Sequence, residues 1–405
     1  MKKILVSSTI ILLVSSFHVI IGQAIWTQKA SLPSTPRWGA IGFSIGSKGY
    51  VGTGYDGSTN YGDFWEYDPI TNSWSQKASL SPRRAASAFV IGTKGYVCMG
   101  ANSGSPTLVD TWEYDPSNNT WTQKANLPSN PRYGCAGFAI GTKGYIGCGN
   151  EGSSSGPYTN EFWEFDPSAN TWMQKASLPG APRYGITHMG WALAGKGYIA
   201  MGLSSTGWLN DLYAYDPATD SWTQKANFPG TGRSYAVAFS SCNSYYAGTG
   251  QNNGSAMNDI WKYNPSNDSW TQTTNFGGGN RWIMTSCVIN SIAYVGTGYD
   301  FTNYYNDWWE YRCGDEGGVF EQPNAINYTS IYPNVFSSYA TLEINKDVFH
   351  KSAMRIFDMT GRLVKQEEIV AKKSTIQKNN LPKGMYLFEV ICEGAKIGWG
   401  KFIIE

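Results

Sequence analysis

Short runs in which apolar and polar residues alternate recur along residues 25–313, and turn residues bound each run. In the third of these units the runs cover residues 134–141, 144–149, 161–167 and 171–177. Period-two alternation over such lengths is typical of half-buried strands. The first two runs are joined by the two-residue turn Thr142-Lys143, and the last two by a short polar turn. Each unit is therefore predicted to form four antiparallel strands, and the chain is predicted to be all-β.

The units repeat with a regular period. The phrase WTQKASLP at residues 26–33 recurs in nearly the same form, and an arginine follows each copy at intervals of 47 to 51 residues. Repeats of this length, each of four strands, predict a β-propeller with one blade per unit. The arginines used for the alignment are Arg37, Arg84, Arg132, Arg183, Arg233 and Arg281.

The first and last units are complementary. In five units a tryptophan follows the third-strand aromatic residue by seven positions, but after Tyr311 that position holds Gly318. The sixth unit thus lacks its outer strand, whereas the first copy of the phrase is an outer strand that precedes any blade. Because an unpaired sheet edge exposes backbone donors and acceptors, we expect the N-terminal strand to complete the sixth blade.

The repeat resembles the Kelch repeat. Its third unit has the opening Arg132, then Tyr145 with Gly147 and Gly149, and finally Trp172 in the outer strand. The family has two adjacent glycines where this chain has Gly-x-Gly, so a subfamily is implied. The resemblance covers residues 25 to about 313. It implies a six-bladed Kelch propeller, closed by three strands from one end of the repeat region and one from the other.

The N-terminus has the pattern of a secretory signal peptide. Lys2 and Lys3 precede an apolar run over residues 4–21, and small residues follow it. Residues 1–22 are therefore predicted to be a signal peptide, cleaved after Gly22 or Ala24. The alternative is a retained membrane anchor. No other stretch is long and apolar enough to span a bilayer, so we expect no transmembrane segment in the mature chain.

The C-terminus differs in composition from the repeats. Residues 314–329 form a predicted linker, and IYPNVF, MRIFDMTGRLV, LPKGMYLFEV and KFIIE follow it in order within residues 330–405. These motifs resemble the type A C-terminal sorting domain of the type IX secretion system of Bacteroidetes, except that Val335 replaces a proline. The resemblance implies a small β-sandwich, contact with the secretion machinery, and a secreted or outer cell-surface location. An ordinary accessory binding domain is the alternative.

Composition narrows the classes of partner. With 31 basic and 30 acidic residues the chain is almost neutral, which argues against nucleic-acid binding through phosphates. The seven cysteines do not recur at matching positions of the repeat, so most are expected to be buried small hydrophobes.

Candidate binding residues gather on one rim of the predicted propeller. This Arg rim carries the repeated arginines, the connections between blades and the variable loops, whereas the opposite rim has only tight turns. Cations and flat aromatic rings suit a glycan or a protein ligand. The candidates are Arg37, Trp38, Arg83, Arg84, Arg132, Tyr133, Arg183, Tyr184, Trp208, Arg233, Arg281, Trp282, Tyr304 and Tyr305.

For the repeated arginines, a structural role is the alternative to ligand binding. Each unit also has one acidic residue at the start of its third strand, so six ion pairs tying loops to blades are the alternative. Residues outside the repeat pattern are the better site candidates. They are Arg83, Trp208, Tyr304 and Tyr305.

No catalytic motif, metal cluster or cofactor fingerprint is present in the sequence. Some Kelch propellers are copper oxidases that need at least two histidines, but the repeats contain only His188, and His350 lies in the C-terminal region. His188 is expected to be a buried hydrogen-bonding residue. The favoured function is a secreted or cell-surface binding module without cofactor or metal. A sugar epimerase or mutarotase is the alternative.

Overall fold

The computed structural model describes residues 25–103, 107–153, 156–241, 244–313, 329–344, 352–358, 362–369, 371–392 and 395–405. The described residues up to Cys313 form one compact unit, and those from Thr329 onward form a second unit. The predicted signal peptide, His350 and the predicted linker apart from Thr329 lie outside the described residues.

The N-terminal unit contains six sheets of antiparallel strands, one for each sequence unit. From the innermost strand outward they are β2 (Ile41–Ile45), β3 (Lys48–Gly52), β4 (Phe64–Asp68) and β5 (Ser73–Lys77); β6 (Ser87–Ile91), β7 (Lys94–Cys98), β8 (Thr111–Asp115) and β9 (Thr120–Lys124); β10 (Ala136–Ile140), β11 (Lys143–Ser153), β12 (Gly156–Asp166) and β13 (Thr171–Lys175); β15 (Gly190–Leu193), β16 (Lys196–Ser204), β17 (Gly207–Asp216) and β18 (Ser221–Lys225); β19 (Val237–Ser241), β20 (Ser244–Gly248), β23 (Ile260–Asn264) and β24 (Ser269–Gln272); and β25 (Thr285–Ile289), β26 (Ile292–Gly296), β27 (Trp308–Arg312) and β1 (Ile25–Lys29). Two short additions lie in the connections. They are β14 (Arg183–Tyr184), which pairs with β16, and the hairpin of β21 (Gln251–Asn252) and β22 (Ser255–Ala256).

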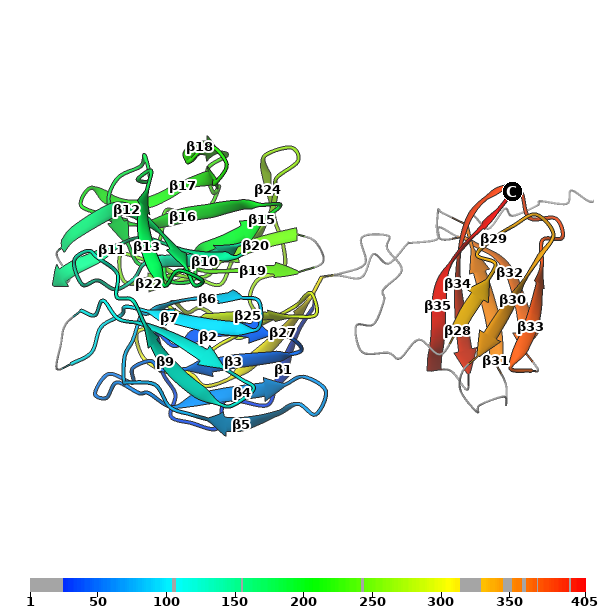
Figure 1. Ribbon diagram of the computed structural model, residues 1–405, viewed down its shortest axis with the longest axis horizontal. Helices are drawn as coiled ribbons and strands as arrows, with labels where there is room; N and C mark the ends of the chain where they lie inside the picture. Colours follow the sequence, from blue (N-terminus) through cyan, green and yellow to red (C-terminus); the bar gives the residue numbers. More distant parts are fainter. Residues whose placement is uncertain are drawn as a thin grey trace, which may run out of the picture. The chain divides into compact units, whose positions relative to one another are not determined.

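The predicted pairing of the N-terminal strand with the sixth unit is present. Strand β1 is antiparallel to β27, with Trp26 opposite Tyr311, and Figure 1 shows the blue β1 beside the yellow β27. The innermost strands contact one another in sequence order, and β2 contacts β25. At that contact a Cβ on Gly42 would lie 2.7 Å from the carbonyl oxygen of Ser286. Small residues on the inner strands therefore allow the first and sixth blades to approach closely.

Aromatic residues fill the space between blades. Between the first and second blades, for example, Phe64 packs against Tyr114 and Trp121 with ring centroids 4.9 and 5.1 Å apart. Phe64 and Tyr114 are fully buried. Each such ring contributes a few kcal/mol to stability, about 25 cal/mol for each Å² of apolar surface removed from water.

The expectation that most cysteines are buried small hydrophobes agrees with the structure in part. Cys98, Cys135, Cys148 and Cys287 are free and buried, whereas Cys313 is disulfide-bonded.

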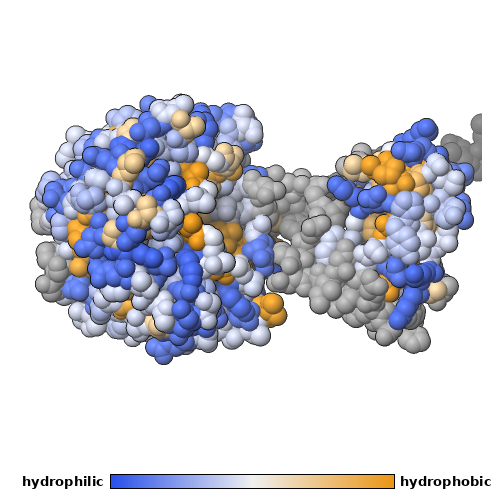
Figure 2. Space-filling view, in the orientation of Figure 1, coloured by the Kyte–Doolittle hydropathy of each residue, from blue (hydrophilic) through white to orange (hydrophobic). Residues whose placement is uncertain are grey.

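The C-terminal unit is a β-sandwich around one apolar core. One sheet contains β28 (Thr329–Tyr332), β30 (Tyr339–Ile344) and β33 (Lys373–Gln377); the other contains β29 (Val335–Phe336), β35 (Ala395–Ile404), β34 (Gly384–Cys392), β31 (Ser352–Phe357) and β32 (Leu363–Ile369). Not all of its apolar side chains are buried. Val335, Met385 and Ile403 are more than a third exposed on neighbouring strands, and Figure 2 shows hydrophobic residues at the surface of this unit.

Candidate functional site

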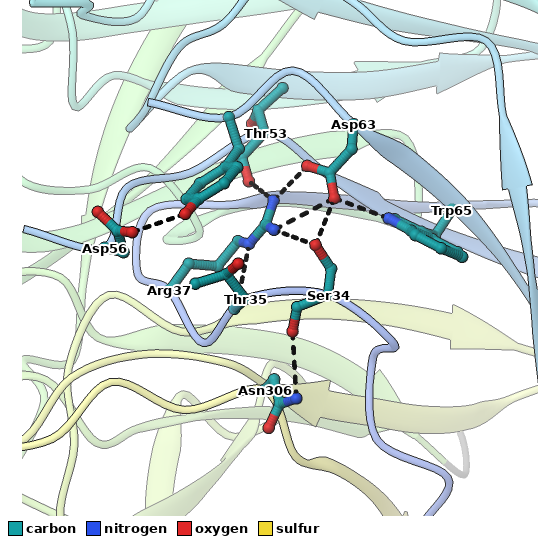
Figure 3. Close-up of polar contacts among 9 residues, drawn as sticks. Ser34, Thr35, Arg37, Thr53, Asp56, Asp63, Trp65 and Asn306 are labelled. Atoms are coloured by element: carbon teal, nitrogen blue, oxygen red, sulfur yellow. Dashed lines mark hydrogen bonds and ion pairs between the residues drawn. The ribbon is translucent and has the colours of Figure 1, made fainter. Parts of the chain in front are cut away.

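Each repeated arginine is held below the Arg rim by a dense set of hydrogen bonds. Arg37 donates to the carbonyl oxygens of Thr35 and Thr53 at 2.9 and 3.0 Å, and its two Nη atoms pair with the Asp63 carboxylate. Figure 3 shows the guanidinium enclosed by these partners. The ring of Tyr61 covers it, with 4.1 Å between Arg37 Cζ and the ring centroid. Arg37 thus connects the loop before β2 to the start of β4.

An arginine–carboxylate pair of this kind occurs in all six blades. The six arginines are at most 1% exposed, so no ligand reaches them without displacing their partners. Burial raises the pKa of Asp63 and Asp110, but the hydrogen bonds and positive charge of the arginine, together with hydrogen bonds from other donors, outweigh it, so the pKa of each falls below its usual value. The structural alternative is therefore confirmed as six ion pairs. They are Arg37–Asp63, Arg83–Asp110, Arg132–Glu161, Arg183–Asp211, Arg233–Asp259 and Arg281–Asp307.

The structure corrects the alignment of the second unit. Arg83, not Arg84, pairs with Asp110, with both Nη atoms 2.8 Å from the carboxylate oxygens. Arg84 is the additional residue, and it lies half-buried at the position that Trp38 and Trp282 occupy in their own blades. A proline precedes the buried arginine in the first four units, and it marks Arg83 in the sequence because Arg84 has none.

A belt of six residues closes the inner end of the Arg rim. One residue from each blade has a positive φ of 48° to 72°, and backbone hydrogen bonds of 2.5 to 3.1 Å connect each blade to the next around the ring. Five of these bonds join two belt residues directly. In the sixth, the Ile186 N–H donates to the carbonyl oxygen of Gly134. The belt residues are Gly39, Ala85, Gly134, Gly185, Tyr235 and Ile283. The non-glycine members accept this left-handed backbone at some cost, which the six bonds offset.

Aromatic side chains cover the belt. Four of them come from the residue after a buried arginine, and Tyr235 comes from the belt itself. Trp38 and Trp282 lie nearly parallel with centroids 6.0 Å apart, and Tyr184 meets Tyr133 and Tyr235 edge-on, each at 5.9 Å. Tyr235 meets Trp282 at 5.5 Å. We call this set the aromatic floor, consisting of Trp38, Arg84, Tyr133, Tyr184, Tyr235 and Trp282.

Loops of the first and sixth blades and strand β12 of the third blade add further rings beside the floor. Phe301 is parallel to Trp282 at 5.3 Å, Tyr299 stacks on Tyr304 at 4.5 Å, and Tyr158 stacks on Tyr184 at 4.7 Å. Tyr55 meets Trp38 edge-on at 5.3 Å. Sequence reasoning missed Tyr55, Tyr158, Tyr235, Tyr299 and Phe301. Four of the other units have a small residue at the belt position where the fifth unit has Tyr235. This difference between the repeats could have identified Tyr235 as a candidate from the sequence.

The remaining candidates lie in different settings. Tyr304 is one of the rings beside the aromatic floor. Tyr305 instead covers Arg281, with 3.8 Å between Arg281 Cζ and the ring centroid, and donates to Asp300, so it supports the Arg281–Asp307 ion pair. Trp208 lies in β17, and its indole nitrogen is buried without a hydrogen-bond partner among the described residues. The structure thus brings together Trp38, Arg84, Tyr133, Tyr184, Trp282 and Tyr304, while the buried arginines support them from below.

His188 lies beneath the belt. Its Nε2 is 3.0 Å from the carbonyl oxygen of Ala40 on the opposite side of the ring. A carbonyl only accepts, so Nε2 carries the proton, and the expected hydrogen-bonding role is confirmed. Burial lowers the pKa of His188 to about 4. A cavity of about 220 Å³ lies along the inner strands, lined by His188, Thr187 and mostly small residues. Within the described residues no cluster of His, Cys, Asp or Glu could hold a metal ion.

Comparison with known proteins agrees with both units. A family model described as the KLHDC2/KLHL20/DRC7 Kelch-repeats domain matches residues 124–283, and one described as the secretion system C-terminal sorting domain matches residues 330–405. The chain is a Kelch-repeat protein with a C-terminal secretion sorting domain. This Kelch protein is also similar to a solved structure titled "Structure of YjhT", with a TM-score of 0.59, 17% identity, and coverage of 69% of this chain and 96% of that one. That likeness concerns the fold alone. No curated protein matches the sequence.

The sorting domain bears on location. It supports export of this Kelch protein by the type IX secretion system to a secreted or cell-surface location, and interaction with that machinery. Among the described residues, no helix has the length and hydrophobicity needed to cross a membrane.

Proposed function

We propose that the exported propeller is a glycan-binding module and that the aromatic floor is its binding surface. The observation that carries the proposal is the continuity of half-buried rings across one rim, from Tyr133 and Tyr184 to Trp282 and Trp38. The apolar faces of sugar rings stack on such side chains, while nearby hydroxyl and amide groups hydrogen-bond to the sugar hydroxyls. Aromatic rings are also rigid, so they lose little conformational entropy on binding.

Binding is favoured over the epimerase or mutarotase alternative. A general acid or base needs a pKa near the operating pH. The carboxylates at the start of each third strand are instead held by arginines, and the pKa of Asp63, Asp110 and Glu161 is lowered: burial raises each pKa, but the combined hydrogen bonds and charge of the arginine and hydrogen bonds from other donors outweigh it. Such groups stay ionised and engaged at neutral pH, which suits a framework better than proton transfer.

A glycan array probed with the purified chain tests the proposal, followed by calorimetry with the strongest hit. We expect Trp282→Ala to weaken binding at least tenfold, since one aromatic stacking contact is worth roughly 1–3 kcal/mol. Tyr339→Ala, an exposed aromatic residue of the C-terminal unit, is the matched control and should bind as the unchanged chain does. If Trp282→Ala binds the array glycans as strongly as the unchanged chain does, the aromatic floor is not the binding surface. Conversion of the bound sugar, followed by NMR, would favour the enzyme.

A further inference from the structure

Two consecutive arginines of the second blade have different environments. Arg83 is fully buried and paired with Asp110. Arg84 lies half-buried in the aromatic floor, and its position in the other blades is taken by aromatic residues or serine. Those residues are Trp38, Tyr133, Tyr184, Ser234 and Trp282. The aromatic floor therefore contains one guanidinium group, and the repeat architecture does not require it.

The contacts of Arg84 hold it among aromatic rings. Its Nη1 donates to Asn60 Oδ1 at 2.8 Å, and its Cζ lies 4.6 Å from the ring centroid of Tyr55 and 5.8 Å from that of Trp38. Burial raises the pKa of the Tyr133 and Tyr235 hydroxyls, and the positive charge of Arg84 acts on both in the opposite direction. Tyr133 comes from the third blade and Tyr235 from the fifth, so the charge of Arg84 acts across the aromatic floor.

No described carboxylate lies within ion-pairing distance of Arg84. The acidic groups of the neighbouring loops are engaged elsewhere. Asp56 accepts from the backbone amides of Ser58 and Thr59 and from the Tyr61 hydroxyl at 2.6 to 2.8 Å. The equivalent Asp300 is held in the same way by its own loop, and Glu151 pairs with Arg132 at 3.1 Å. Arg84 is thus a cation that has no carboxylate partner among the described residues.

A carboxylate is the ligand group that fits this site. A partly desolvated guanidinium gains from a planar anion that accepts two parallel hydrogen bonds, and the carboxylate of a uronic or other sugar acid provides one. The aromatic faces around Arg84 would meanwhile contact the sugar ring. We propose that the aromatic floor selects glycans that carry a carboxylate and that Arg84 is the residue that selects them. This inference rests on the proposed glycan-binding function.

The test compares the full chain with Arg84→Gln on matched ligands. The probes are tri-galacturonate, its methyl ester, which removes the charge from the same sugar, and a sulfated oligosaccharide of similar length. We expect the unchanged chain to bind the acid at least tenfold more tightly than the ester, with an affinity that falls as salt is added. Arg84→Gln should bind acid and ester alike, and Arg84→Lys should retain part of the preference because a lysine offers a charge without the planar fork.

Control variants separate the possible outcomes. Arg312→Gln removes a more exposed arginine at the end of β27 distant from the Arg rim, and it should keep the preference for the acid. Thermal unfolding of Arg84→Gln should match that of the unchanged chain, whereas Arg83→Gln should be less stable. Equal binding of acid and ester, a preference for the sulfated probe, or a preference that persists in Arg84→Gln would overturn the inference while leaving glycan binding intact. Failure to bind any glycan on the array would overturn both proposals.

Discussion

At the residue scale, the environment of each polar side chain decides between structure and binding. A guanidinium that has a partly buried carboxylate, carbonyl oxygens and an aromatic cover as its partners, as Arg37 has, is part of the framework. The repetition of arginine and acid in the sequence was enough to raise this interpretation, because both residues recur in every unit. The sequence alignment nevertheless chose Arg84 over Arg83, because it did not use the proline that precedes the buried arginine in the first four units.

His188 provides a prediction about pH. Its pKa is lowered from 6.5 to about 4 in the folded protein because burial disfavours the charged form. Between these values the unfolded chain binds the extra proton, so the contribution to stability is complete above about pH 6.5 and is lost as the pH falls toward 4. The expected slope is about 1.4 kcal/mol per pH unit.

Urea unfolding at pH 7 and pH 5 measures this loss. His188→Gln keeps a donor for the Ala40 carbonyl but does not titrate, so the difference between the two pH values should shrink by about 2 kcal/mol relative to the unchanged chain. An identical pH dependence in the two proteins would show that His188 is not the responsible group.

At the element scale, the repeated phrase is an outer strand plus the connection to the next blade. The alanine of the phrase is held from both sides: Ala30 N–H donates to Asn72 Oδ1 at 2.9 Å, and Trp74 Nε1 donates to the Ala30 carbonyl at 2.7 Å. The same pair of bonds recurs at Ala78, Ala125, Ala176 and Ala226. We call it the blade latch, and it explains why the phrase recurs so faithfully.

Strand β1 carries this latch between the sixth and first blades. It also places Trp26 against Phe276 and Tyr311 at 4.8 and 4.7 Å, and Lys29 against Glu310 at 3.1 Å. Deleting residues 25–33 should therefore lower the thermal midpoint of the whole propeller and not only fray one edge. Calorimetry on the truncated chain gives the measurement, and an unchanged midpoint for the propeller would contradict the role of β1.

At the scale of the whole molecule, one joint of the ring differs from the others. Among the described residues, the fifth and sixth blades share no blade latch, and Trp26 Nε1 has no hydrogen-bond partner. The outer strand of the sixth blade comes from the N-terminus, so β27 is not joined to it by the tight turn that supplies the accepting side chain in the other blades. Instead, the hydroxyls of Thr273 and Tyr311 lie 3.2 Å apart.

This joint should open first. Losing two hydrogen bonds of about 1 kcal/mol each predicts at least tenfold more frequent local opening there than at a latched joint. Hydrogen exchange followed by mass spectrometry should therefore show faster exchange in β24 and β1 than in the equivalent outer strands β9 and β13. Equal protection of all four strands would mean that side-chain packing alone sets the stability of the joint.

The sequence by itself determined the strands, the six blades, the N-terminal outer strand and the sorting domain. The strands, the blades and the outer strand depend on period-two patterning and on intervals between repeats, which are local properties of the chain, whereas the sorting domain was identified by the resemblance of four sequence motifs to a known family. Only the tertiary structure decided the belt, the aromatic floor and the unpaired state of Arg84. Side chains from all six blades meet there although up to about 245 residues separate them, and whether a cation is free depends on every charge that the ring brings near it.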